Sequence, residues 1–245
     1  TKAKTAPEVK IVPLLAVLIL GAFVTILNQT LLNTALPPIK EDFGVSTNTV
    51  QWLTTVFMLV NGVMIPVTAF LIEKFTTRGL FLTAMGLFAL GTLIGVLSPN
   101  FGTLVLARVV QAAGAGIMMP LIQTILFIIF PIEKRGSAMG LFGLVIAFAP
   151  AIGPSLSGYL VDQYHWKVLF YIILPIAIFD IIFAYFLLKN VTTLKNPKVD
   201  IPSIILSTFG FGGLLYGFSA AGEGWGNLDV IITIIIGVIS LFFFI

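Results

Sequence analysis

No cysteine occurs among the 245 residues of the chain. Its absence excludes a disulfide framework, cysteine-ligated zinc or iron–sulfur sites and a thiol nucleophile. Charged residues are also scarce, at 9%, whereas a soluble domain carries about 25%. The 13 lysines and arginines occur singly or in pairs between apolar runs, which excludes a basic surface for nucleic acid. With 58% hydrophobic residues, the composition predicts an all-α integral membrane protein in contact with the lipid bilayer.

Signatures of enzymes are missing too. The single histidine, His165, falls in a predicted outer turn, and Ser155-Leu-Ser157-Gly158 lacks the first glycine of an intramembrane serine-protease loop. No Gly-rich phosphate loop followed by Lys-Ser or Lys-Thr occurs. We therefore predict no catalytic residue, no metal site and no cofactor.

Eight apolar segments account for most of the sequence, and each of the first six is long enough to cross a hydrocarbon core of about 30 Å. They lie at 11–36, 48–72, 79–98, 102–130, 136–162, 167–188, 201–221 and 230–245. The last segment is short and ends without a polar flank, so we expect the chain to be the amino-terminal portion of a longer protein. The predicted parts are a cytoplasmic tail (1–10), a six-helix transmembrane bundle (11–188), a cytoplasmic linker (189–200) and extra transmembrane helices (201–245), the last one truncated.

Basic residues are spread unevenly over the connections. If the amino-terminal tail lies inside the cell, ten of the 13 lie in inner segments and two, Lys40 and Lys167, in outer ones; the remaining one is Arg108. Cytoplasmic loops of membrane proteins carry such an excess of Lys and Arg. We therefore expect a multi-pass protein of the cytoplasmic membrane with a cytoplasmic amino terminus.

An internal repeat relates residues 69–81 to residues 158–170. The two stretches align without gaps, with three identical and six conservatively replaced positions. One stretch follows the second apolar segment on the predicted inside, and the other follows the fifth on the outside. The pattern predicts a bundle of two inverted three-helix repeats, and solute sites usually lie between such repeats.

Arg108 places a full positive charge inside the segment 102–130. Such a charge costs about 2.5–3.5 kcal/mol at the bilayer centre. At about 100° per residue, a polar and flexible stripe within an arc of roughly 120° comprises Arg108, Gln111, Ala115, Met119 and Gln123. The opposite side, which includes Leu106 and Ile117, is apolar and is expected to meet lipid. Arg108 therefore either supports a polar site or anchors a helix end by snorkelling.

Uncharged polar side chains are frequent in the first two segments. Amides within lipid need partners in other helices or in a water-filled cavity. Together with the stripe, they are interpreted as a substrate cavity lined by Asn28, Gln29, Asn33, Gln51, Trp52, Asn61, Gln111, Met119 and Gln123. Hydrogen bonding between helices, at about 0.6 kcal/mol per bond, is the alternative interpretation.

Two further groups of residues indicate moving parts. The segment 136–162 carries small and helix-bending residues on a strip about 80° wide, which suits a helix that rocks or seals against a neighbour, although packing alone could select it. The turn after the second segment holds Glu73, Lys74 and Arg78, which predict either a weak cytoplasmic gate or charges that set topology. Asp180 is the one acidic residue clearly inside a span. It is interpreted as a group that binds and releases a proton, or as a paired structural group.

The residues resemble the major facilitator superfamily, specifically its drug:proton antiporter branch of fourteen helices, which includes Gram-positive multidrug and lincomycin efflux proteins. Residues 27–37 look like the helix-one motif of that branch, and residues 106–116 are similar to its helix-four motif. The resemblance ties Arg108 to proton coupling. The antiporter motif of helix five is matched by Gly143, Pro150, Gly153, Pro154 and Gly158.

Two departures from the family pattern matter. Asn28 stands where many relatives have an aspartate, and Ala69 and Thr76 replace glycines in the loop between helices two and three. By the resemblance, a second six-helix bundle and half of the binding cavity lie beyond the chain.

We therefore expect a secondary transporter, a monomer without cofactor, that exports amphiphilic drugs in exchange for protons by alternating access. Apolar walls with Met and Phe and scattered amides favour a broad cavity over a dedicated polar pocket. The alternatives are a carrier for one lipid or metabolite and a non-transporting membrane receptor or assembly subunit.

Overall fold

A computed structural model describes residues 11–192, 201–221 and 226–244. Over these ranges the chain is all-helical, and six of its helices are long and apolar enough to cross a membrane. The six are α1 (Ile11–Thr34), α3 (Thr47–Lys74), α4 (Thr77–Leu97), α5 (Phe101–Ile129), α6 (Ile132–Gln163) and α7 (Val168–Leu187). Two further apolar helices follow, α8 (Ile201–Ala220) and α9 (Leu228–Phe244). All eight predicted helices are confirmed, and the chain is a multi-pass membrane protein.

One short helix, α2 (Leu36–Phe43), was not predicted. The sequence favours a continuous segment to residue 36, but the chain turns at Ala35 and begins a new helix with Pro37 and Pro38 in its first turn. Proline fits there because the first backbone N–H groups of a helix have no partner within the helix. Gly44, with φ of 61°, ends α2 in the left-handed conformation that glycine adopts without strain.

Three of the long helices begin at side-chain caps. Ser46 Oγ accepts from the Thr49 backbone N–H at 3.1 Å, and Thr76 Oγ1 accepts from Gly79 N–H at 3.1 Å. Asn100 Oδ1 likewise accepts from Thr103 N–H at 2.9 Å. Each cap satisfies a donor that the helix itself leaves unpaired, and this explains where α3, α4 and α5 start.

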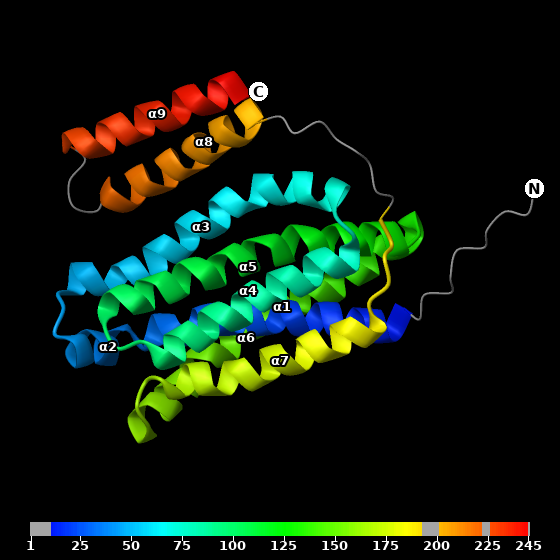
Figure 1. The fold of residues 1–245 in the computed structure, drawn as a ribbon, viewed down its shortest axis with the longest axis horizontal. Coiled ribbons are helices and arrows are strands. Elements are labelled where there is room, and N and C mark those ends of the chain that lie inside the picture. The colour runs from blue at the N-terminus through cyan, green and yellow to red at the C-terminus, as the bar shows by residue number, and fades with distance from the viewer. Residues whose placement is uncertain (1–10, 193–200, 222–225, 245) are drawn as a thin grey trace, which may run out of the picture.

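The helices run alternately up and down (Figure 1). α1 packs between α6 and α7, while α5 packs along α4 and α3. The hairpin of α8 and α9 lies beside α3, on the outside of the six-helix group. One end of the bundle holds α2, the start of α3 and the connections α4–α5 and α6–α7, and we call it the α2 end.

Close packing of α4 on α5 depends on two glycines. A Cβ at Gly91 would lie 2.5 Å from the Gln111 backbone nitrogen, and one at Gly114 would lie 2.8 Å from the Phe88 nitrogen. Small residues allow transmembrane backbones to approach in this way. Because α3, α4 and α1 surround α5, the prediction that Ile117 meets lipid was wrong: its side chain is 3% exposed, whereas Leu106 is 54% exposed.

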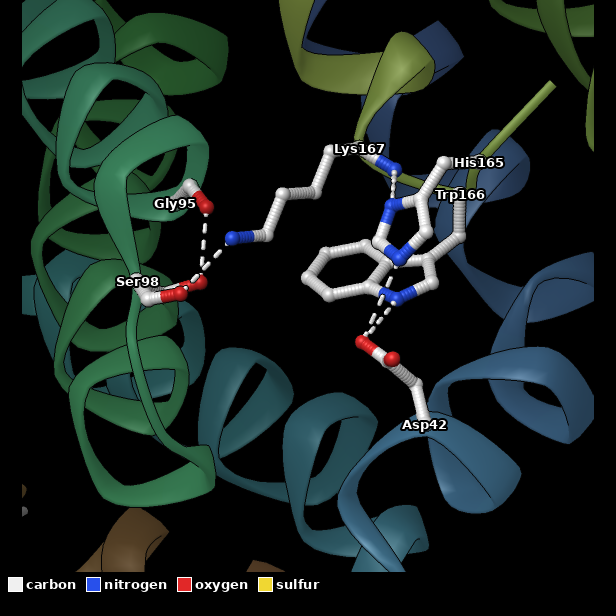
Figure 2. Close-up of polar contacts among 6 residues, drawn as sticks. All are labelled: Asp42, Gly95, Ser98, His165, Trp166 and Lys167. Atoms are coloured by element: carbon white, nitrogen blue, oxygen red, sulfur yellow. Dashed lines mark hydrogen bonds and ion pairs between the residues drawn. The ribbon is translucent and has the colours of Figure 1, made fainter.

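At the α2 end, a clasp ties the α6–α7 connection to α2 and α4 (Figure 2). The Trp166 indole Nε1 donates to Asp42 Oδ2 at 2.8 Å, and His165 Nε2 lies 3.4 Å from the same oxygen. Lys167 Nζ donates to the Ser98 carbonyl, at the carboxyl end of α4, at 2.8 Å. The hydrogen bond from Trp166 is the main cause that lowers the pKa of Asp42 below its ordinary value.

Candidate functional site

The guanidinium of Arg108 lies at the centre of the bundle with no exposed surface. Its Nη1 donates to Gln111 Oε1 at 2.8 Å and to Asn28 Oδ1 at 3.0 Å, and its Nε donates to the Leu53 carbonyl at 3.3 Å. Three helices therefore supply acceptors: α1, α3 and α5 itself. This is the geometry of a supported polar site and not of a side chain that snorkels to a helix end.

The charge of Arg108 meets neutral groups. Its guanidinium carbon lies 4.1 Å from the centre of the Phe57 ring, within cation–π range. Its Nη2 has no hydrogen-bond partner in the described part of the chain. Gln111 extends the network by donating to Thr92 Oγ1 of α4 at 2.8 Å. Hydrogen bonds from Nη1 and Nε and the ring of Phe57 thus hold the guanidinium, and the Nη2 group remains without an acceptor.

Asp180, on α7, is also fully buried, and neither carboxylate oxygen has a partner among the described residues. Its Oδ2 would lie 2.9 Å from a Cβ at Gly21, so the absence of a side chain on α1 makes room for the carboxyl group. Met118 of α5 and Phe81 of α4 approach the same glycine. The carboxyl therefore sits in an apolar niche between four helices.

Asp180 and Arg108 make no direct contact, yet both face α1. Gly21 lies beside the carboxyl and Asn28 beside the guanidinium. Residues seven apart lie on nearly the same side of a helix, about 10 Å from each other. A basic group from α5 and an acidic group from α7 therefore contact one face of α1, and neither has an ionic partner in the described ranges.

The predicted substrate cavity is divided in the structure. Gln29, Asn61 and Met119 line a small cavity of about 40 Å³ together with Thr25, Ile26, Phe57 and Ala115. Asn28 and Gln111 are engaged by Arg108 instead. A space of this size holds about one water molecule, so it is a constriction and not a drug-sized pocket.

The other predicted cavity residues lie elsewhere. Asn33 accepts a hydrogen bond from Thr54 at 3.1 Å, and Gln123 is exposed on α5. Gln51 and Trp52 line a separate pocket with residues of α8. Within the described part of the chain, Arg108 and Gln111 of the stripe on α5 are buried, whereas Gln123 is exposed.

The antiporter motif on α6 presents two faces. Gly153 is buried against Thr30 of α1, with no room for a Cβ, and Ser157 Oγ donates to the Leu31 carbonyl at 2.8 Å. The predicted strip of small residues points away from this contact. Its residues are exposed or half-buried: Gly143, Ala147, Pro150, Pro154 and Gly158.

The predicted gate lies at the end of the bundle opposite α2. Lys74 Nζ is 5.5 Å from the centre of the Phe70 ring, and the Arg78 guanidinium is 4.5 Å from that of Tyr185 on α7. Glu73 is exposed at the end of α3. The predicted tail (1–10) and residues 193–200 of the predicted linker lie outside the described residues.

Several site residues were not identified from the sequence. Thr92 is visible as a polar residue in an apolar segment and could have been selected by that signal. Phe57 and the Leu53 carbonyl carry no such signal, because their role depends on how α3 is rotated towards Arg108. Tyr216 and Ser219 of α8 were missed for the same reason.

Comparisons with known proteins agree with this architecture. The family model described as Major Facilitator Superfamily matches residues 18–245. The chain is 62% identical over 233 residues to the uncharacterized MFS-type transporter YcnB of Bacillus subtilis, covering 95% of this chain and 49% of that protein. It is 43% identical over 247 residues to the lincomycin resistance protein LmrB of the same organism, covering 100% of this chain and 52% of that protein.

A solved structure shares the fold. The peptide transporter POT, crystallised in complex with sulfate, superposes with a TM-score of 0.71 at 13% identity, over 94% of this chain and 51% of that one. At that identity the likeness concerns the fold alone. The chain spans about half the length of the curated relatives that it matches.

Proposed function

Since the chain belongs to the major facilitator superfamily, we propose that the full-length protein exports amphiphilic drugs across the cytoplasmic membrane in exchange for protons, by alternating access. The observation that carries this proposal is Arg108, a fully buried cation held by neutral acceptors from three helices. Ionisable groups inside a membrane bundle are costly and mark ion or substrate pathways. The similarity to a lincomycin resistance protein supports drugs as the substrate class.

The proton-binding group in this proposal is Asp180. Asn28 occupies the site on α1 nearest to Arg108, and an amide does not titrate. The carboxyl of Asp180 is buried on the same side of α1, without a hydrogen-bond partner among the described residues. A carboxyl there carries either a proton or an uncompensated buried charge, and exchange between these two states is the event that antiport requires.

Arg108 sets the electrostatic environment of this exchange. Two opposite charges that do not touch interact strongly in a medium of low dielectric constant and weakly in water. Access of water to one side of the bundle therefore changes how strongly the arginine favours a charged Asp180. The coupling needs no direct salt bridge between the two groups.

The small cavity beside the arginine is the candidate contact with substrate. Its walls combine Phe57 and Met119 with the amides of Gln29 and Asn61. Flexible and apolar side chains of this kind suit amphiphilic ligands of varied shape. In this proposal the remaining half of the full-length protein supplies the opposite wall, the amino terminus is cytoplasmic, the α2 end faces outward, and a monomer works without a cofactor.

Drug-dependent proton movement tests the proposal. Proteoliposomes containing the full-length protein are loaded with a pH-sensitive dye, and an inward-directed or outward-directed pH gradient is imposed before ethidium or lincomycin is added. Antiport predicts drug uptake only when the lumen is more acidic than the outside, because a proton must leave the lumen as the drug enters it. A protonophore, which collapses the gradient, should abolish this uptake. Uptake that ignores the pH gradient would contradict proton coupling, and no response to a broad drug panel would favour a narrow-substrate carrier or a receptor.

A further inference from the structure

A second pocket lies at the α2 end, where α3 and α8 converge. It has a volume of about 460 Å³, within the range of about 300–1,000 Å³ typical of small-molecule sites. Its lining is Asn48, Gln51, Trp52 and Thr55 of α3 with Tyr216, Ser219 and Ala220 of α8. None of these residues lines the small cavity or binds Arg108, so the pocket is a separate site.

The two walls of this pocket are fixed to each other. The rings of Trp52 and Tyr216 lie 6.0 Å apart at a tilt of 35°, and the hydroxyls of Thr55 and Ser219 are 3.3 Å apart. Further along the helices, the side chain of Leu215 fills the space that Gly62 leaves open. The pocket is therefore formed by contacts along two helices and not by a loop.

The described lining residues are mainly polar or aromatic, and none of them is charged. The side-chain amides of Asn48 and Gln51 make no hydrogen bond to other described residues, so both remain available to a ligand. Each amide offers two N–H donors and one carbonyl acceptor. Trp and Tyr add flat apolar faces with a polar tip. Donors, acceptors and ring faces together suit a neutral, hydroxyl-rich ring, and the described lining residues include no counter-charge for a cation.

We propose that this pocket binds a neutral, hydroxyl-rich group such as a sugar-like ring, borne either by an exported drug or by the headgroup of a glycolipid. The proposal rests on the proposed function in so far as the drug is the source, and it then adds a substrate class: amphiphiles with a polyhydroxylated part. It gives α8 a role in specificity, since Tyr216 and Ser219 belong to that helix.

The competing interpretation is an aromatic belt. Trp and Tyr gather at membrane interfaces without binding any ligand, and Trp52 is 42% exposed. A belt requires neither free amides facing the same space nor a second helix closing it. Binding measurements separate the two interpretations, because a belt residue contributes to membrane insertion and not to affinity for a soluble ligand.

The test is equilibrium binding of radiolabelled lincomycin, an amide-linked polyhydroxylated ring, to the full-length protein in liposomes of sugar-free phospholipid. The variants are Gln51→Leu and Tyr216→Leu, and their matched controls are Gln163→Leu and Tyr164→Leu, two exposed residues at the same end of the bundle. We expect binding to weaken about tenfold in each pocket variant, the loss expected for one or two hydrogen bonds, and to stay unchanged in the controls.

Two further arms assign the source of the ligand and separate this inference from the proposed function. Adding a diglucosyl lipid to the liposomes competes with lincomycin if a lipid headgroup fits the pocket, whereas an equal amount of unglycosylated lipid does not. Ethidium has no hydroxyl group, so its proton-driven export by the wild-type protein reports on the proposed function independently of the pocket. If the wild-type protein shows no proton-driven ethidium export, the proposed function is overturned and the pocket is not. Unchanged binding of both lincomycin and the diglucosyl lipid in the pocket variants would overturn the pocket.

Discussion

Arg108 and Asn28 form a pair of a buried cation and a neutral amide, joined by a hydrogen bond of 3.0 Å from Nη1 to Oδ1. An aspartate at position 28 would pair directly with the guanidinium and neutralise it, whereas the amide of Asn28 leaves the charge of Arg108 uncompensated. The nearest buried acid described here is then Asp180, two helical turns away along α1. The arrangement separates the fixed charge from the proposed proton site.

Replacing Arg108 tests whether the fork of donors is needed. Lysine keeps the charge, but one ammonium group cannot reach Asn28, Gln111 and the Leu53 carbonyl together. It also lacks the planar group that arginine stacks on the Phe57 ring. We expect Arg108→Lys and Arg108→Ala to insert and bind drug, yet to lose proton-coupled export by at least about tenfold, the factor that about 1.4 kcal/mol of lost stabilisation represents. The measurement is drug uptake under an imposed pH gradient. Full export by the lysine variant would show that charge alone suffices, and Arg135→Lys controls for insertion.

Gly153 tests the contact between α6 and α1. A Cβ at this position would collide with the side chain of Thr30, whereas a Cβ at Gly143 would meet nothing within 4 Å. We expect Gly153→Ala to destabilise the protein by about 1–3 kcal/mol through overpacking, and Gly143→Ala to leave its stability unchanged. Thermal unfolding in detergent measures both. Equal melting temperatures for the two variants would refute the close packing of α6 on α1.

Pro154 lies on the other face of α6, which no described helix covers. If this strip seals against the remaining half of the full-length protein, Pro154→Leu should abolish efflux while the melting temperature of the purified protein changes little. Whole-cell ethidium efflux and thermal unfolding are measured on the same variant. Normal efflux would mean that the strip of small residues has no gating role.

The clasp at the α2 end should loosen in acid. The pKa of Asp42 lies below its ordinary value because Trp166 donates to the carboxylate, so the stability that this pair contributes is present above the ordinary pKa of about 3.9 and is lost as pH falls through the lowered value. In the full-length protein with every tryptophan other than Trp166 replaced by Phe, the emission of Trp166 should shift as pH falls below about 4. Asp42→Asn should remove this shift, whereas Asp162→Asn, at an exposed residue, should not. A shift that survives in Asp42→Asn would assign it to another group.

The positions of the long helices could be predicted because each needs an uninterrupted apolar run, and such runs are visible without any tertiary information. α2 escaped prediction because it is short and carries Pro37 and Pro38, which usually end a helix and here begin one. Ile117 was misplaced because the prediction gave α5 one lipid face, whereas neighbours cover most of its surface.

Within the site, the sequence identified Arg108, Asn28 and Gln111 but not how they meet. Which side chain faces the guanidinium depends on the rotation of α3 and α4 about their axes, and nothing in the sequence sets that rotation for Phe57 or Thr92. The pocket beside Trp52 was hidden for a related reason. Its second wall is α8, and no local pattern indicates that α8 packs on α3.

The most direct test of the central claim, that Asp180 carries the proton and Arg108 tunes it, is drug-induced proton release in everted vesicles containing the full-length protein. Asp180→Asn should bind drug but release no protons, because an amide cannot exchange them. Proton release by Asp180→Asn at the wild-type rate would contradict the account.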